Sequence, residues 1–108
     1  MSVHLINKFG LTERGMNVFQ GTFMQYPEVT KVYIFGSRAK GNYKPGSDID
    51  LAVINEGVSD RTLLQLANDF DESDLPYKVD IIYTPDLKHA ELKDHIDRVG
   101  IIFYEKIN

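Results

Sequence analysis

The chain has 108 residues, of which 43% are hydrophobic and 26% are charged, and it carries a formal net charge of −4 and no cysteine. This length predicts one domain over residues 1–108, built around one hydrophobic core. The acidic balance argues against direct contact with nucleic acid. The lack of cysteine excludes disulfide bonds, thiolate metal sites and a cysteine nucleophile.

The first residues do not show a basic region followed by an apolar core, so no signal peptide is expected. No apolar run approaches the roughly 20 residues of a membrane-spanning helix. We therefore expect a cytoplasmic protein without a membrane partner. His4, His89 and His95 are not expected to bind a metal or to act in catalysis, because His89 and His95 would diverge on a helix.

The first predicted elements are a helix and a strand. Apolar residues recur at helical spacing over residues 12–26, with Thr12 as a candidate N-cap and Pro27 as the stop. The β-branched and aromatic stretch 31–35 predicts a strand that ends at Gly36. Residues 36–46 follow as a turn segment with glycine, proline and three cations but no anion.

The second half of the chain continues this alternation. A second strand is predicted over residues 48–54, followed by a helix capped by Ser59. The buried face of that helix is expected to carry four apolar residues, namely Leu63, Leu66, Ala67 and Phe70.

A third strand is predicted over residues 78–83, and a third helix capped by Asp86 is predicted to run to about Gly100. Residues 101–104 are predicted to form a short strand or a buried anchor. The order of elements is typical of an α+β protein, in which helices pack on one small mixed sheet.

Two aspartates stand at the start of the second strand. Asp48 and Asp50 alternate, so their side chains are expected on the same face, about 6.6–7 Å apart at the backbone. Without a cation such a pair would repel, whereas hard oxygen ligands in this arrangement suit Mg²⁺. The alternative interpretation is a pair of solvated residues at the end of a strand.

Gly36 and Ser37 directly follow the first strand. Glycine allows backbone N–H groups to approach an anion, and a turn that leads into a helix is a typical phosphate site. Alternatively, Ser37 caps a short helix over residues 38–41. A P-loop is excluded, because Asn42 and Tyr43 follow Gly41 where that motif requires Lys and Ser or Thr.

Asp80 lies in the middle of the apolar third strand, where a carboxylate is unfavourable unless it is paired or bound to a metal. If the third strand lies beside the second, Asp80 completes a cluster of three carboxylates with Asp48 and Asp50. The alternative is an edge strand whose polar face is in water.

The pattern of Gly36-Ser37, ten residues, then Asp48-x-Asp50, with the later Asp80, resembles the polymerase-β-like nucleotidyltransferase superfamily. Within it, the chain resembles the minimal nucleotidyltransferases, including antitoxins that pair with HEPN-domain proteins. The motif covers residues 36–51, and the length and order of elements agree with the minimal type over nearly the whole chain.

The resemblance implies that Asp48 and Asp50 hold two Mg²⁺ ions that bind ATP. Asp80 would join the second ion and help to activate the acceptor hydroxyl. Two such ions, about 3.5–4 Å apart, stabilise both the attacking and the leaving oxygen of an in-line displacement.

The resemblance also implies that Gly36 and Ser37 hold the outer phosphates. Arg38 and Lys40 either offset the charge of the pyrophosphate leaving group or are solvated cations of the loop. The expected acceptor is a tyrosine hydroxyl of a HEPN-domain toxin, which would receive AMP. The alternatives are a non-catalytic antitoxin with nucleotide-dependent binding, and an enzyme that modifies a small hydroxylated molecule such as an antibiotic.

Overall fold

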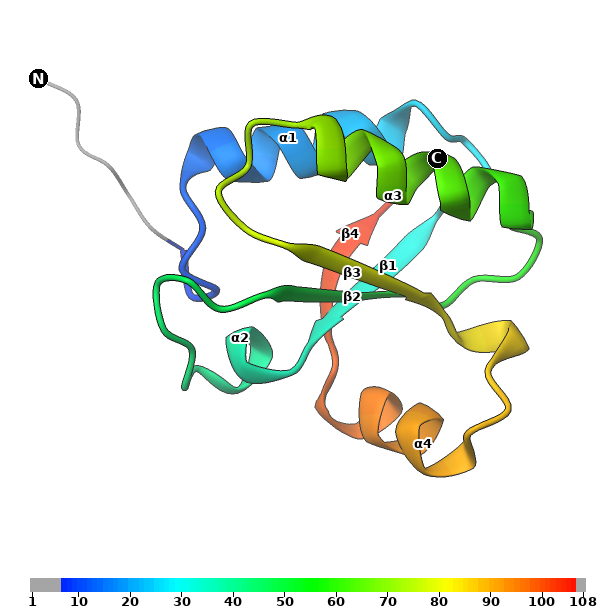
Figure 1. Ribbon diagram of the computed structural model, residues 1–108. Helices are drawn as coiled ribbons and strands as arrows, with labels where there is room; N and C mark the ends of the chain where they lie inside the picture. The colour runs from blue at the N-terminus through cyan, green and yellow to red at the C-terminus, as the bar shows by residue number, and fades with distance from the viewer. Residues whose placement is uncertain (1–6, 107–108) are drawn as a thin grey trace, which may run out of the picture.

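The computed structural model describes residues 7–106, which build a four-stranded sheet with helices on both of its faces (Figure 1). Along the chain the elements are α1 (Glu13–Met24), β1 (Lys31–Phe35), α2 (Ser37–Lys40), β2 (Ile49–Val53), α3 (Asp60–Glu72), β3 (Val79–Tyr83), the 3₁₀ turn η1 (Thr84–Asp86), α4 (Ala90–Val99) and β4 (Ile101–Glu105). The predicted α+β class is confirmed. Across residues 7–106, no helix combines the length and apolar character needed to cross a bilayer.

The strands lie in the order β3-β2-β1-β4. β1 pairs antiparallel with both β2 and β4, whereas β2 and β3 are parallel. A parallel pair cannot be closed by a tight turn and needs a crossover connection, and α3 lies in the segment that supplies it. This crossover brings the third predicted strand beside the second.

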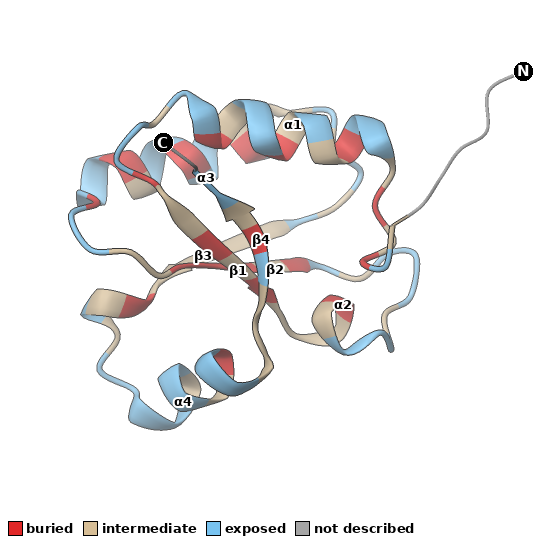
Figure 2. Cartoon of the chain, turned by 180° about the vertical axis from the view of Figure 1, so that it is seen from behind, coloured by how far each residue is buried: buried red, intermediate tan, exposed pale blue. Residues whose placement is uncertain are grey.

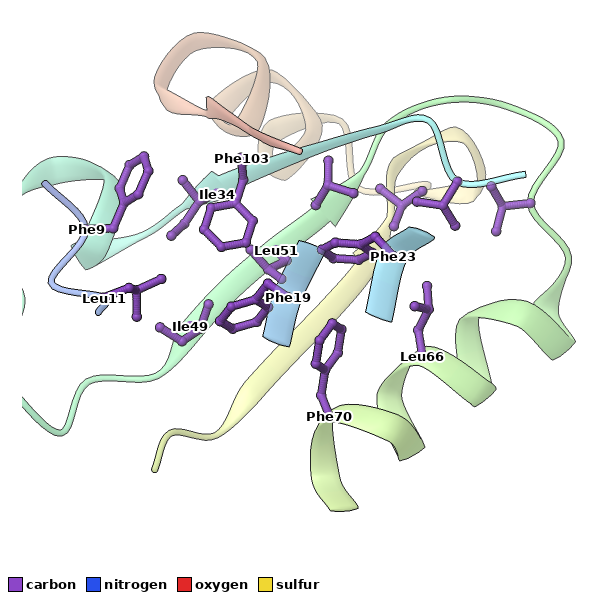
Figure 3. Packing of buried hydrophobic residues seen from close by; sticks show 14 residues of the cluster. Phe9, Leu11, Phe19, Phe23, Ile34, Ile49, Leu51, Leu66, Phe70 and Phe103 are labelled. Atoms are coloured by element: carbon purple, nitrogen blue, oxygen red, sulfur yellow. The ribbon is translucent and has the colours of Figure 1, made fainter. Parts of the chain in front are cut away.

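One face of the sheet carries the hydrophobic core and is covered by α1 and α3 (Figures 1 and 3). Leu51 in β2 is fully buried, and the ring of Phe19 from α1 lies over this face. The centroid of the Phe19 ring is 5.1 Å from that of Phe70 in α3 and 5.1 Å from that of Phe103 in β4. Aromatic contacts therefore join α3 to α1 and α1 to the sheet.

The two predicted serine and threonine caps are confirmed. The Thr12 hydroxyl accepts a hydrogen bond from the amide of Gly15 at 3.1 Å, and the Ser59 hydroxyl accepts one from the amide of Thr62 at 3.2 Å. The predicted buried face of α3 is wrong in one position, because Ala67 is exposed and Thr62 is buried instead. Thr62 is four positions before the buried Leu66, so it shares the same side of the helix.

The prediction that Asp86 caps the third helix is wrong. Asp86 ends the 3₁₀ turn η1, and the backbone is extended at Leu87 before α4 begins. The cap is His89, whose Nδ1 atom accepts a hydrogen bond from the amide of Leu92 at 3.1 Å. Histidine is not among the strongly preferred capping residues, so the sequence pattern did not reveal it.

Candidate active site

Asp50 and Asp80 face each other across two neighbouring strands. In the parallel pairing of β2 with β3, Asp50 lies directly opposite Asp80. Ile49 and Leu51, on either side of Asp50, are fully buried in the core, so alternation directs Asp50 to the opposite face. β3 therefore lies beside β2, as a site shared by Asp50 and Asp80 requires. It is nevertheless an edge strand, and the Asp80 side chain is 46% exposed.

Asp48 lies immediately before β2 and is exposed. Its charge nevertheless acts on its neighbour. Burial raises the pKa of the Asp50 carboxyl above its usual value, and the negative charges of Asp80 and then Asp48 raise this pKa further. The three carboxylates thus form one electrostatically connected group at this end of the sheet.

Gly36 joins this group from the end of β1. The antiparallel pairing of β1 with β2 places Phe35 opposite Asp50, and Gly36 comes next. Its backbone has a φ of 74°, which favours glycine, and a Cβ atom at this position would overlap the Oδ2 atom of Asp50. Any larger residue would displace the carboxylate, so Gly36 is an integral part of the site.

Gly36 is also the N-cap of α2, and Ser37 is the first residue of that helix. The alternative in which Ser37 caps a helix over residues 38–41 is therefore wrong. Ser37 is half-buried, and Lys40, at the end of α2, is exposed. Contact of these two side chains with a phosphate group stays a prediction.

Arg38 does not lie on the surface of the loop. Its side chain is buried, with 1% of the residue exposed, so the alternative of a solvated cation is wrong. Its donors bind three backbone carbonyls, those of Phe9, Pro45 and Ser47. With these donors engaged, we assign Arg38 to the architecture of the loop and leave Lys40 as the predicted phosphate-facing cation.

The donor set of the site suits a hard divalent cation. Within residues 7–106, no group of three or more histidine, aspartate or glutamate side chains is arranged so that it could hold a metal ion. Asp48, Asp50 and Asp80 offer the oxygen donors that Mg²⁺ prefers, and bound positive charge would relieve the repulsion that raises the pKa of Asp50. Of the histidines, His89 caps α4 and His4 lies outside the described residues.

Lys78 and two tyrosines near Arg38 contact residues of the site, although no role was predicted for them from the sequence. The Nζ atom of Lys78 is 3.9 Å from the Oδ1 atom of Asp80. Their two-residue spacing, which places both on one face of a strand, is the signal that points to this contact. The rings of Tyr43 and Tyr77 lie 4.9 and 4.6 Å from the Arg38 guanidinium carbon, and no local pattern indicates that contact.

Known proteins resemble this chain in sequence and in fold. The family model described as "Polymerase beta, Nucleotidyltransferase" matches residues 17–108. The chain is also 38% identical over 81 residues to a Haemophilus influenzae protein described as "Probable protein adenylyltransferase MntA". That alignment covers 74% of this chain and 69% of the relative.

Two solved structures share the fold. One is a toxin–antitoxin with AMP-PNP, with a TM-score of 0.68 and 22% identity. The other is a mutant of the toxin–antitoxin MntA-HpeT, with a TM-score of 0.66 and 19% identity. Each match covers 84% of this chain and 73% of the other. Together with the matched domain and the relative, they show that the chain belongs to the polymerase beta nucleotidyltransferase family and is a nucleotidyltransferase.

Proposed function

We propose that this chain transfers AMP from ATP to a hydroxyl group of a partner toxin and thereby acts as an antitoxin. The observation that carries the proposal is the meeting of three distant segments: Asp50 lies against Gly36 and opposite Asp80. A small protein can support phosphoryl chemistry with such a site, because catalysis is mostly positioning and neutralisation of charge.

In this proposal Asp48, Asp50 and Asp80 hold the divalent ions. Bound Mg²⁺ would neutralise charge on the triphosphate and on the departing pyrophosphate. The backbone at Gly36 and Ser37 would orient the outer phosphates. Asp80 would help to remove the proton of the acceptor hydroxyl as the acceptor oxygen bonds to the α-phosphorus. The bond from that phosphorus to the oxygen that bridges it to the β-phosphate breaks, and pyrophosphate leaves with that oxygen.

The openness of the site favours an acceptor carried on another protein. The Asp80 side chain is 46% exposed on an edge strand, so an acceptor can approach it from solvent. One cavity of about 380 Å³ is lined by residues between 64 and 79. Another of about 190 Å³ is lined by residues between 12 and 18 and between 74 and 77. Neither cavity includes the three carboxylates. Small-molecule acceptors usually bind in enclosing pockets, so a protein surface fits this site better.

The similar proteins suggest the kind of partner. One relative is described as a probable protein adenylyltransferase, and two of the solved structures that share the fold are toxin–antitoxin complexes. We extend this to a HEPN-domain toxin whose tyrosine receives the adenylyl group.

The proposal is tested by incubating the chain with its HEPN partner, ATP and Mg²⁺ and measuring the intact mass of the partner. We expect a gain of one or more adenylyl groups, located on tyrosine by peptide mass spectrometry and abolished by EDTA. The double variant Asp48→Asn with Asp50→Asn should lose the transfer. Asp71→Asn, an exposed residue of α3, is the matched control and should retain it.

The same experiment separates chemistry from binding alone. If the double variant still neutralises the toxin without any gain in mass, the chain is a binding antitoxin and the catalytic proposal is wrong. Loss of neutralisation while the complex stays intact supports the catalytic role. Transfer to a small hydroxylated molecule in place of the partner would contradict the proposed acceptor.

A further inference from the structure

Arg38 ties together three segments next to the carboxylates. Its Nη1 atom donates to the carbonyl of Phe9 at 3.0 Å, and its Nη2 atom donates to those of Pro45 at 3.2 Å and Ser47 at 2.9 Å. Ser47 is the residue immediately before Asp48. The guanidinium group therefore holds the end of the loop that delivers Asp48 to the site.

The surroundings of Arg38 hold its side chain in one position. The guanidinium carbon lies 4.9 Å from the centre of the Tyr43 ring and 4.6 Å from that of Tyr77, and the Nε atom is buried without a hydrogen-bond partner. Burial of a cation is unfavourable unless hydrogen bonds and aromatic faces replace its water. Lysine cannot reproduce a planar fork that binds separate carbonyls while stacking on rings.

The backbone at Asp48 is anchored on both sides. Before it, the carbonyl of Ser47 accepts from Arg38, and after it, the amide of Ile49 donates to the carbonyl of Lys78 at 2.9 Å. The second anchor belongs to the pairing of β2 with β3. On the loop side, the hydrogen bonds between Lys44 and Ser47 lie within the loop itself, and Arg38 connects this end of the loop to α2 and to Phe9.

We propose that Arg38 is a positioning residue that clamps the loop before Asp48 and so sets the distance between Asp48 and Asp50 for metal binding. The metal-binding part of this inference rests on the proposed function, whereas the clamp itself does not. A misplacement of about 1 Å in such a site lowers activity by about a hundredfold.

The test compares Arg38→Met and Arg38→Lys with the unmodified chain. We expect amide hydrogen exchange over residues 42–48 to accelerate about tenfold in both variants, while the amides of β1 and β2 stay protected. Binding of Mn²⁺ in the presence of ATP, followed by electron paramagnetic resonance, should weaken about tenfold, and the Mg²⁺ concentration for half-maximal transfer should rise in parallel. Arg14→Met is the matched control, because Arg14 is 82% exposed, and it should change none of these values.

Each possible result either supports or overturns the proposed role of Arg38. Unchanged exchange over residues 42–48, or full rescue of metal binding by Arg38→Lys, overturns the clamp. Faster exchange with unchanged Mn²⁺ binding shows a clamp that does not position the metal site, which also overturns the inference. If both Arg38 variants fail to fold, Tyr43→Leu removes one stacking face from the half-exposed loop and is judged by the same two readouts.

The proposed function fails separately. In that case the unmodified chain neither binds Mn²⁺ with ATP nor transfers AMP, and the exchange experiment still decides whether Arg38 clamps the loop.

Discussion

The two faces of the sheet differ in what covers them and in what they carry (Figure 2). On one face, α1 and α3 bury aromatic and aliphatic side chains, with Phe19, Phe23 and Leu66 fully inaccessible to solvent. On the other, the short α2 and the peripheral α4 leave the Asp50 and Asp80 positions half-exposed. Neighbouring residues of β2 therefore experience opposite environments.

The first face is responsible for the stability of the fold, and the second carries the candidate site. Apolar burial on the first face supplies the main favourable free energy of folding. The second face gathers negative charges, and burial followed by repulsion from Asp80 and Asp48 raises the pKa of Asp50. Repulsion between neighbouring carboxylates is destabilising, and these residues lie outside the hydrophobic core. Substitutions on the two faces should therefore affect different measurements.

The largest expected effect is that of Asp50→Asn on the site face. We expect the rate of adenylyl transfer to fall at least about a thousandfold, equivalent to about 4 kcal/mol, because the divalent ions of the proposed mechanism would lose a carboxylate ligand. The free energy of unfolding, measured with urea, should stay equal or rise, since a repelled and half-buried charge is removed. A clear loss of stability would show that the two faces are not separable in this way.

On the core face, Leu66→Ala should lower the free energy of unfolding by about 3 kcal/mol, because it removes fully buried methyl groups and leaves a cavity. The matched control is Leu64→Ala on the same helix, where the side chain is 72% exposed. Its effect should remain below about 0.5 kcal/mol. Urea unfolding measures both, and similar losses would contradict the assignment of the buried face of α3.

A smaller effect is expected from Tyr26→Phe, which tests a hydrogen bond between the segment that follows α1 and the helix α3. The Tyr26 hydroxyl donates to Asp69 in α3, and this bond, followed by burial and by the charges of Asp69 and Glu28, raises the pKa of Tyr26. At pH 7 the variant should lose about 1 kcal/mol, a modest value because the pair is partly exposed.

The pH dependence of that loss has a definite sign. Because the pKa of Tyr26 is raised by folding, its stabilising contribution is complete below the unfolded-state pKa of about 10 and disappears as the pH rises through the folded-state value. The difference in unfolding free energy between the unmodified chain and Tyr26→Phe should therefore shrink above pH 10. A difference that does not change with pH would exclude the Asp69 hydrogen bond as its source.

The smallest effect is expected on the outer surface of α1. Gly21 lies within the helix with no heavy atom within 4 Å of an added Cβ, so Gly21→Ala should stabilise the fold by about 0.7 kcal/mol through helix propensity. Gly10→Ala is the opposite case, because φ is 77° there and the added atom would meet Tyr43 and Arg38. Thermal unfolding should therefore shift upward for the first and downward for the second.

Much of the fold and part of the site could be predicted from local sequence. The strand over residues 31–35 has the predicted bounds, and Thr12 and Ser59 cap the helices as expected. The alternation of Asp48 and Asp50 beside Gly36 and Ser37 indicated the family that the comparisons show. These features depend on residues within a few positions of one another, where propensity, capping and alternation act.

Other features depended on contacts between distant residues. The register that sets Asp80 opposite Asp50 follows from how the crossover through α3 packs against the sheet. Arg38, for which a phosphate-facing cation and a solvated loop cation were the two predictions, is buried because it binds the carbonyl of Phe9, which lies 29 positions away, and stacks on Tyr77. The sequence by itself determined which carboxylates and glycine were available. The tertiary structure decided which of them meet, because packing between distant elements sets their distances.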